Sequence, residues 1–193
     1  MSADAGRLVV VKVGGSLFDL PDLGPRLRTW LATRGGDALL VPGGGATADV
    51  VRALDRTHGL GEEAAHWLAL RALTVNAHFL RALVPEATIV GQPHERPIPA
   101  SMPAILDAFR FACADEGRPG QLPHCWAVTS DALAARVAVV AKARQLVLLK
   151  SVALPEGMTW TEAGRCGFVD EWFARVLEQA RIDLTVKWVN VRG

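Results

Sequence analysis

The sequence predicts an α/β fold, a three-layer αβα sandwich with a mainly parallel central sheet. Short apolar runs rich in β-branched residues alternate with stretches of helical periodicity, a pattern typical of parallel sheets covered by helices. Two of these runs, at 9–13 and 39–41, lead directly into glycines and then into a helical pattern. With 193 residues the chain can bury one sizeable core, so we expect a single domain over 1–193.

The first half of the chain predicts two strands and three helices. The strands are at 9–13 and 39–41, and the helices are at 21–33, 46–57 and 62–83. The first helix carries leucines and a tryptophan on one face and arginines on the other, and we expect it to end at Gly35 and Gly36. A glycine corner at 58–61 separates the second helix from the third.

The second half alternates again between strands and helices. It predicts a strand at 87–90, a rigid proline-rich loop at 91–103, a helix at 104–114, a short strand or extended segment at 126–131, a helix at 132–143, a strand at 146–151, an irregular stretch at 152–167, a helix at 169–179 and a last strand at 184–191. We expect the loop to be extended because it contains four prolines.

Composition excludes several classes of function. The formal net charge is +1, so no general attraction to nucleic acid or to anionic membranes is expected. The three cysteines are widely spaced and include no C-x-x-C pair, which indicates a reducing compartment and no protein-held metal site. The polar first six residues do not resemble a signal or transit peptide, and no apolar run reaches about 18 residues. We therefore expect a soluble, cytoplasmic protein.

The first chemical signal is the segment 12–16. Gly14 and Gly15 follow an apolar strand, and consecutive amides at such a turn, with the dipole of a following helix, form a site for an anion. Lys12 lies within the apolar pattern, where an ammonium costs several kcal/mol unless an anion or carboxylate meets it. The simpler alternatives are an ordinary turn and a lysine that reaches solvent.

A second glycine cluster makes the anion interpretation stronger. Gly43, Gly44 and Gly45 also follow a strand and precede a helix, so two anion-holding loops are expected side by side on one parallel sheet. Neither loop has the spacing of a P-loop or of G-x-G-x-x-G.

Two further candidates lie in the second half of the chain. Asp131 follows Thr129 and Ser130 at the start of a helix, where it can act as a cap, as a partner for a lysine, or as both. Lys150 ends the most apolar strand and can either serve the same anion or reach solvent.

These segments resemble the amino acid kinase superfamily, which includes acetylglutamate, uridylate, aspartate and isopentenyl phosphate kinases. The resemblance is carried by KVGGSL, VPGGG and TSDALAARVA followed by LVLLKSV. A finer resemblance, carried by HGLGEEAAHWLALRAL and HCWAVTSDALAARVA, is to a compact aspartokinase-like branch that includes kinases acting on aminomethyl-furanmethyl phosphate in methanofuran synthesis.

The resemblance implies transfer of the γ-phosphoryl group of ATP, with Mg²⁺, to a small phosphate or carboxylate acceptor. It also implies a homodimer or higher homo-oligomer, with an acceptor half at about 1–125 and a reduced nucleotide half at about 126–193. The implied roles are Lys12 against the transferring phosphoryl group, Asp131 orienting the lysines, Gly14, Gly15, Ser16 and Ser130 binding the nucleotide, and Gly43, Gly44 and Gly45 binding the acceptor. Such donors and cations suit phosphoryl transfer, which needs positioning and positive charge.

The chain departs from the family after its late strand. The nucleotide-gripping Asp-Gly-hydrophobic-Tyr segment of relatives is replaced by the residues 150–157, KSVALPEG, and the usual Gly-Met-x-x-Lys context is missing. We therefore assign the second lysine role, in catalysis and nucleotide binding, to Lys150. The shortened segment also motivates an alternative function, a catalytically inactive ligand-binding or regulatory member of the fold. A further alternative is an assembly subunit that packs with a catalytic partner.

Two histidines lie near the expected acceptor. His58 and His66 flank the glycine corner after the second glycine loop, where they can contact the acceptor or can instead cap and pack helices. The six tryptophans are read as packing residues rather than as a nucleotide platform.

Overall fold

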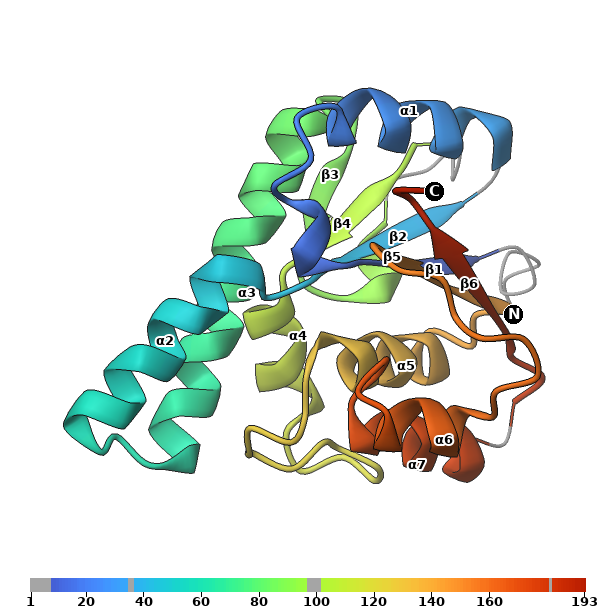
Figure 1. The fold of residues 1–193 in the computed structure, drawn as a ribbon. Helices are drawn as coiled ribbons and strands as arrows, with labels where there is room; N and C mark the ends of the chain where they lie inside the picture. Colours follow the sequence, from blue (N-terminus) through green and yellow to red (C-terminus); the bar gives the residue numbers. More distant parts are fainter. Residues whose placement is uncertain (1–7, 35–36, 97–101, 181) are drawn as a thin grey trace.

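The central sheet of the structure has six strands, and each strand pair is parallel (Figure 1). The structure is a computed structural model that describes residues 8–34, 37–96, 102–180 and 182–193. The strand order is β3-β4-β2-β1-β5-β6. The strands are β1 (Val9–Val13), β2 (Ala38–Pro42), β3 (Thr88–Val90), β4 (Ala104–Leu106), β5 (Gln145–Lys150) and β6 (Thr185–Asn190). The predicted α/β class with a mainly parallel sheet is confirmed.

Helices cover both faces of this sheet. They are α1 (Leu23–Arg34), α2 (Gly45–His58), α3 (Glu62–Leu83), α4 (Ala108–Asp115), α5 (Ser130–Val140), α6 (Trp160–Arg165) and α7 (Glu171–Gln179). In Figure 1, α1 lies on one side of the sheet, and α5, α6 and α7 lie on the other. Side chains of α1 and the second half of α3 form one core cluster with one face of the central strands. Side chains of α4, α5, α6 and α7, with Leu70 and Leu73 of α3, form the other cluster with the opposite face.

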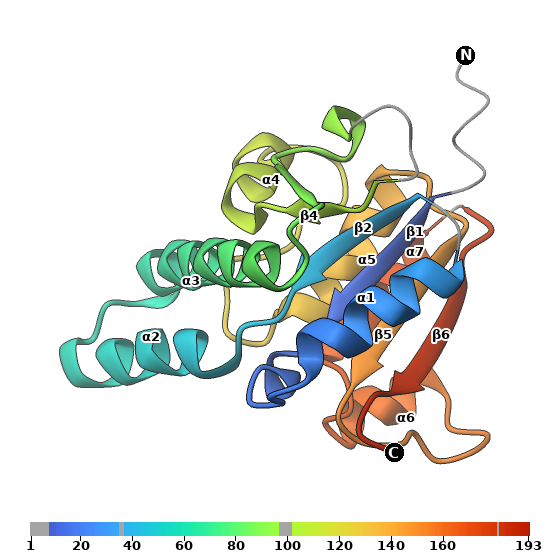
Figure 2. The ribbon, with the colours of Figure 1, turned by 90° about the horizontal axis from the view of Figure 1, so that it is seen from above.

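Helices α2 and α3 extend side by side away from the sheet, as Figure 2 shows. The chain reverses between them at Gly59 and Gly61, which have φ values of 60° and 85°. Backbone of this left-handed kind favours glycine, so the predicted corner is confirmed. The pair forms one side of the site described below.

Two predicted elements are wrong. Residues 104–106 form the buried strand β4 between β2 and β3, and the helix begins only after Asp107, whose carboxylate accepts hydrogen bonds from the N–H groups of Phe109 and Arg110. Three apolar residues before a helix cap fit either element, and only the neighbouring strands decide between them. The segment predicted at 126–131 as a short strand or extended stretch is not a strand: residues 126–127 form a turn, and 128–129 have no regular structure. The expected helix cap at its end is present, because Thr129 is the N-cap of α5.

The stretch predicted as irregular, 152–167, contains the short helix α6. Thr159 and Glu162 form a reciprocal capping box at its start, a signal that the T-x-x-E spacing already carries. The expected helix end at Gly35 and Gly36, the first six residues and part of the proline-rich loop lie outside the described residues. No helix in the described part of the chain is both long and apolar enough to cross a membrane.

Asp170 joins the two helices that carry the second half of the site. Its Oδ2 accepts hydrogen bonds from Thr129 N, Thr129 Oγ1 and Ala132 N at 3.1, 2.7 and 2.9 Å, at the start of α5. Its Oδ1 accepts from the N–H groups of Trp172 and Phe173, both at 3.0 Å, at the start of α7. One carboxylate therefore caps two helices.

We predict that Asp170→Ala lowers the free energy of unfolding by about 2–4 kcal/mol, because two caps worth about 1–2 kcal/mol each are lost. Thr159→Ala, which removes the single exposed cap of α6, should cost about 1 kcal/mol. Urea unfolding followed by circular dichroism measures both values. Equal losses in the two variants would show that Asp170 does not serve both helices.

Candidate functional site

Lys12 and Lys150 lie on the same face of the sheet because of strand periodicity. Side chains two residues apart on a strand point to the same face of the sheet. Lys12 therefore lies on the same face as Val10, and Lys150 lies on the same face as Leu148. Val10 and Leu148 belong to the core cluster beneath α5, and β1 pairs directly with β5. The two lysines therefore lie at or next to the ends of neighbouring strands and extend toward the start of α5.

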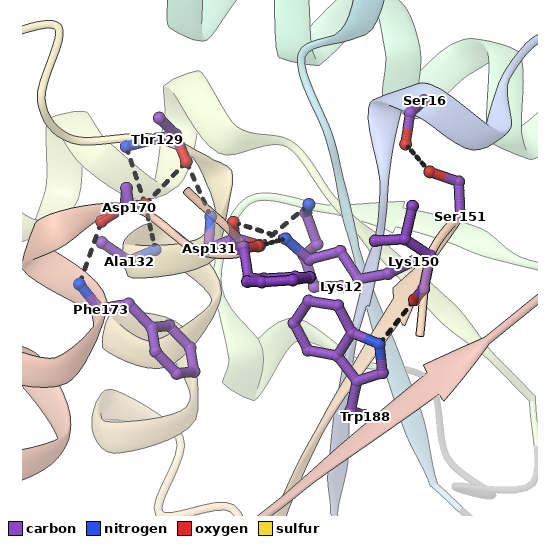
Figure 3. Close-up of polar contacts among 12 residues, drawn as sticks. Lys12, Ser16, Thr129, Asp131, Ala132, Lys150, Ser151, Asp170, Phe173 and Trp188 are labelled. Atoms are coloured by element: carbon purple, nitrogen blue, oxygen red, sulfur yellow. Dashed lines mark hydrogen bonds and ion pairs between the residues drawn. The ribbon is translucent and has the colours of Figure 1, made fainter. Parts of the chain in front are cut away.

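The carboxylate of Asp131, in the first turn of α5, lies between the two ammonium groups (Figure 3). Lys150 Nζ donates a hydrogen bond to Asp131 Oδ2 at 2.8 Å, and Lys12 Nζ lies 2.9 Å from Oδ1. The 2.9 Å contact of Lys12 with Oδ1 is a buried ion pair, and an ammonium has three N–H donors, of which this contact uses one. The remaining N–H groups of Lys12 can therefore serve a ligand oxygen.

All three side chains are nearly buried, with relative exposures of 5% for Lys12, 5% for Asp131 and 9% for Lys150. Burial alone would raise the pKa of the Asp131 carboxyl, but the charges of Lys12 and Lys150 outweigh burial and hold that pKa below its usual value. Burial, together with the charge of Lys12, lowers the pKa of Lys150 to about 8. Two cations thus share one carboxylate, and the trio keeps a net charge of about +1 near neutral pH.

Lys150 is also fixed by its other neighbours. Its Nζ donates a 2.6 Å hydrogen bond to the carbonyl oxygen of Phe168, and it lies 5.1 Å from the ring centre of Trp188 on β6. Close to it, the hydroxyls of Ser16 and Ser151 lie 2.9 Å apart and tie the first glycine loop to the segment after β5 (Figure 3).

The two glycine loops pack backbone against backbone. A Cβ on Gly15 would lie 2.2 Å from Gly45 N, and a Cβ on Gly43 would lie 2.3 Å from Gly15 N. No side chain fits at either position. Gly45 also has a φ of 52°, which favours glycine. The predicted side-by-side arrangement of the loops is confirmed.

Two of the predicted phosphate-binding amides are not available. Gly14 N donates to Leu149 O at 2.9 Å, and Gly43 N donates to Val13 O at 2.8 Å. These bonds continue the parallel ladders of β1 with β5 and of β2 with β1. The roles expected for the amides of Gly14 and Gly43 are therefore corrected, since both residues shape the loops instead.

The start of α2 supplies the amides that remain. The side-chain amide of Asn76, on α3, donates to the carbonyl oxygens of Gly43 and Gly44, both at 2.7 Å. Because the C=O and N–H of a planar trans peptide point in opposite directions, the N–H groups of Gly44 and Gly45 face away from α3, toward the first glycine loop and the cavity. The first N–H groups of a helix lack intrahelical acceptors and attract anions.

A cavity of about 380 Å³ opens beside this site. Lys12 and Lys150 lie at one end, together with Gly44 and Gly45 at the start of α2. Among the predicted site residues, those that line it are Lys12, Gly15, Ser16, Gly44, Gly45, His66, Ser130 and Lys150. Asp131 does not line the cavity itself, because the two lysines lie between its carboxylate and the cavity.

His58 is exposed at the far end of α2, about 20 Å along the helix from Gly45, so the expectation that it contacts the acceptor is wrong.

His66 lines the cavity within a cluster that joins α3 to the segment before α5. It stacks on His124 with ring centres 4.2 Å apart. The two nitrogens of His124 lie 2.6 Å from Glu63 and 3.1 Å from Glu116. Burial, followed by the charge of His124, lowers the pKa of His66 to about 4, so His66 is neutral near pH 7 and presents an uncharged wall.

The sequence reasoning missed three contributors to the site: Asn76, Asp170 and Ser151. A polar residue on the apolar face of the helix at 62–83 is a usable signal for Asn76, because a buried amide needs partners. The sequence marks Asp170 only as an N-cap for the helix that follows it, since its partners at the start of α5 are 38–41 residues away. Nothing local identifies Ser151, whose partner is 135 residues away.

Comparison with known proteins identifies the family of this chain. The sequence pattern of the amino acid kinase family matches residues 7–153, more than half of the chain. The protein belongs to the amino acid kinase family, so the resemblance seen in the sequence is confirmed.

Individual relatives are more distant. The chain is 24% identical over 151 residues to the [5-(aminomethyl)furan-3-yl]methyl phosphate kinase of Methanocaldococcus jannaschii, covering 74% of this chain and 65% of that protein. The match thus spans a little less than two thirds of the relative. The fold is similar to the uridylate kinase of Archaeoglobus fulgidus (TM-score 0.63, 18% identity, 96% of this chain and 92% of that one) and to the UMP kinase of Bacillus anthracis (TM-score 0.64, 13% identity, 97% and 88%).

We predict that Gly15→Ala lowers the free energy of unfolding by about 1–3 kcal/mol, because the new methyl group must push two backbones apart. Gly164→Ala is the control: its Cβ would meet atoms no closer than 3.6 Å within α6, and it should stabilise the protein by about 0.5–1 kcal/mol. Urea denaturation measures both changes. If Gly15→Ala were as stable as the wild type, the loops would not be in contact.

Proposed function

We propose that this protein transfers the γ-phosphoryl group of ATP to a small acceptor. The observation that carries the proposal is the sharing of one carboxylate by two buried ammonium groups, at a cavity that also receives the N-terminus of α2. Buried cations in excess of their carboxylate need an anion, and phosphate oxygens meet that need. Membership of the amino acid kinase family supports the same chemistry.

The residues would act by position and charge. Lys12, which keeps N–H groups beyond the one that faces Asp131, stabilises the oxygens of the phosphoryl group during an in-line displacement. Lys150 does the same from the neighbouring strand and contributes to holding the nucleotide. Asp131 contacts no phosphate and keeps both ammonium groups at the ends of their strands.

The amides of Gly44 and Gly45, at the start of α2, add donors that need no reorganisation during the reaction. Ser16, Gly15 and Ser130 complete the lining at this end of the cavity. The acceptor oxygen bonds to the γ-phosphorus as the bond to the leaving ADP oxygen breaks, so no covalent intermediate with the protein is required.

The donor set fits a magnesium ion carried by the nucleotide rather than by the protein. Among the described residues, no group of three or more His, Cys, Asp or Glu side chains could hold a metal ion. Both oxygens of Asp131 face lysines. When bound with the nucleotide, Mg²⁺ would neutralise charge on the phosphates.

For the acceptor we propose a phosphate monoester of the size of an aminomethyl-furanmethyl phosphate. Support comes from the relative that is named as a kinase of such a compound, and from a cavity volume that suits a small molecule. Amino acid carboxylates and isopentenyl phosphate are the competing acceptors in the same test panel. Binding of these ligands without formation of ADP from ATP, whichever acceptor is present, would instead support the inactive, ligand-binding alternative.

Lys12→Ala should reduce ADP formation on the preferred acceptor by about 10²–10³-fold, the effect of losing one preorganised donor to a developing charge. Nucleotide affinity measured by calorimetry should weaken by about 1–3 kcal/mol, the range for hydrogen bonds to charged groups. Lys187→Ala, on the exposed side of β6, removes an equal charge elsewhere and is the control. Unchanged turnover in Lys12→Ala would contradict the mechanism.

The lowered pKa of Lys150 gives a prediction for pH dependence. Because the protonated ammonium is the form that binds phosphate, kcat/KM should be level below Lys150's pKa of about 8 and should fall by about tenfold per pH unit above it. A bound phosphate favours the protonated form, so kcat should begin to fall at a higher pH than kcat/KM.

Profiles from pH 7.5 to 10 measure this, outside the range in which phosphate groups titrate. In Lys150→Arg the guanidinium stays charged, so the decline in kcat/KM above about pH 8 should disappear even if the rate is lower. The same decline in wild type and variant would assign it to another group.

A further inference from the structure

A second buried ion pair lines the cavity away from the lysines. Arg136 extends from α5, and Asp115 is the last residue of α4. Arg136 Nε donates to Asp115 Oδ2 at 2.8 Å, and Nη2 donates to Oδ1 at 2.7 Å. The relative exposures are 8% and 6%, and both residues line the cavity. Neither contacts the trio of Lys12, Asp131 and Lys150.

This pair leaves one polar group of the guanidinium unused. Among the described residues, none accepts a hydrogen bond from Arg136 Nη1. Gly120 is the residue next to Nη1, and it has a φ of 81°. A Cβ at position 120 would lie 2.8 Å from Nη1. A side chain at position 120 would therefore collide with Nη1, and glycine leaves that space clear. Asp115 fixes the orientation of the guanidinium, and Nη1 still has N–H groups to donate.

Stability alone does not account for such a pair. The free-energy cost of removing two charges from water is often larger than the gain from their attraction. Apolar residues of similar volume commonly stabilise a protein as much as a buried ion pair does. A buried Arg that is held by two bonds and retains a free donor at a cavity is instead suited to recognising a ligand.

We propose that Arg136 is a specificity-determining residue that donates from Nη1 to a hydrogen-bond acceptor at the far end of the phosphoryl acceptor. The inference rests on the proposed function, because it takes the phosphate of that molecule to lie at Lys12. Arg136 follows Asp131 by five residues on α5, a rise of about 7.5 Å along the helix axis, so Arg136 lines the cavity beyond the lysines, at a separation that a small molecule can span.

The charges around Arg136 select an uncharged group. Asp115 already neutralises the guanidinium, and Glu116 lines the same part of the cavity. A second anionic group would therefore meet no net positive charge there. A hydroxyl, ether or carbonyl oxygen matches the site.

The test compares two acceptor mimics that differ in one group. 4-(Hydroxymethyl)benzyl phosphate carries a distal hydroxyl, and 4-ethylbenzyl phosphate carries a methyl group in its place. Calorimetry with the wild type should show about tenfold or greater preference for the hydroxyl compound, because a site built for a hydrogen bond rejects the analogue that lacks it. In the double variant Arg136→Met, Asp115→Leu, which leaves no unpaired charge, the ratio of the two dissociation constants should approach one.

A second variant guards against loss of fold. Arg136→Lys keeps the charge and loses the planar fork, so it should retain folding by circular dichroism and show an intermediate ratio. A wild-type ratio near one, an unchanged ratio in a folded variant, or no binding of either compound overturns the inference. ADP release by the wild type tests the proposed function separately, so transfer without discrimination would leave that function standing.

Discussion

The sharing of Asp131 between Lys12 and Lys150 is the interaction on which the arrangement of the site depends. An ammonium in an apolar sheet is costly unless a carboxylate meets it, and here one carboxylate meets two of them. The requirement aligns three elements at once, because β1, β5 and the start of α5 must converge within hydrogen-bond distance. It also leaves a surplus of positive charge at the cavity, which is the physical reason for proposing a phosphate ligand.

Close backbone packing is the second constraint. Gly15 and Gly45 bring the two loops together at a separation that no side chain allows, and Asn76 holds the carbonyl groups of the second loop. The N-terminus of α2 is thereby directed to the region of the lysines. Asp170, which caps α5 and α7 with one carboxylate, supports the opposite side, so the position of Asp131 depends on a residue 39 positions away that touches no ligand in our proposal.

The cavity extends this polar centre into a region of different character. Neutral His66, the His124 cluster and the Arg136–Asp115 pair give its far side donors and acceptors with little net charge. A site with cations at one end and a balanced polar wall at the other suits a molecule with one phosphate and one uncharged polar group. Membership of the amino acid kinase family agrees with the phosphate end.

Several features of the protein are encoded by local pattern in the sequence. These are the alternation of strands and helices, the strand parity of Lys12 and Lys150, the two glycine loops and the position of Asp131 at a helix start. Three other features depend on contacts between distant parts of the chain: 104–106 is a strand, the amides of Gly14 and Gly43 belong to the sheet, and His58 lies outside the site. The reason is physical: periodicity and turn preferences act over a few residues, whereas a ladder partner, a shared cap or a cavity wall depends on residues that are distant in the chain.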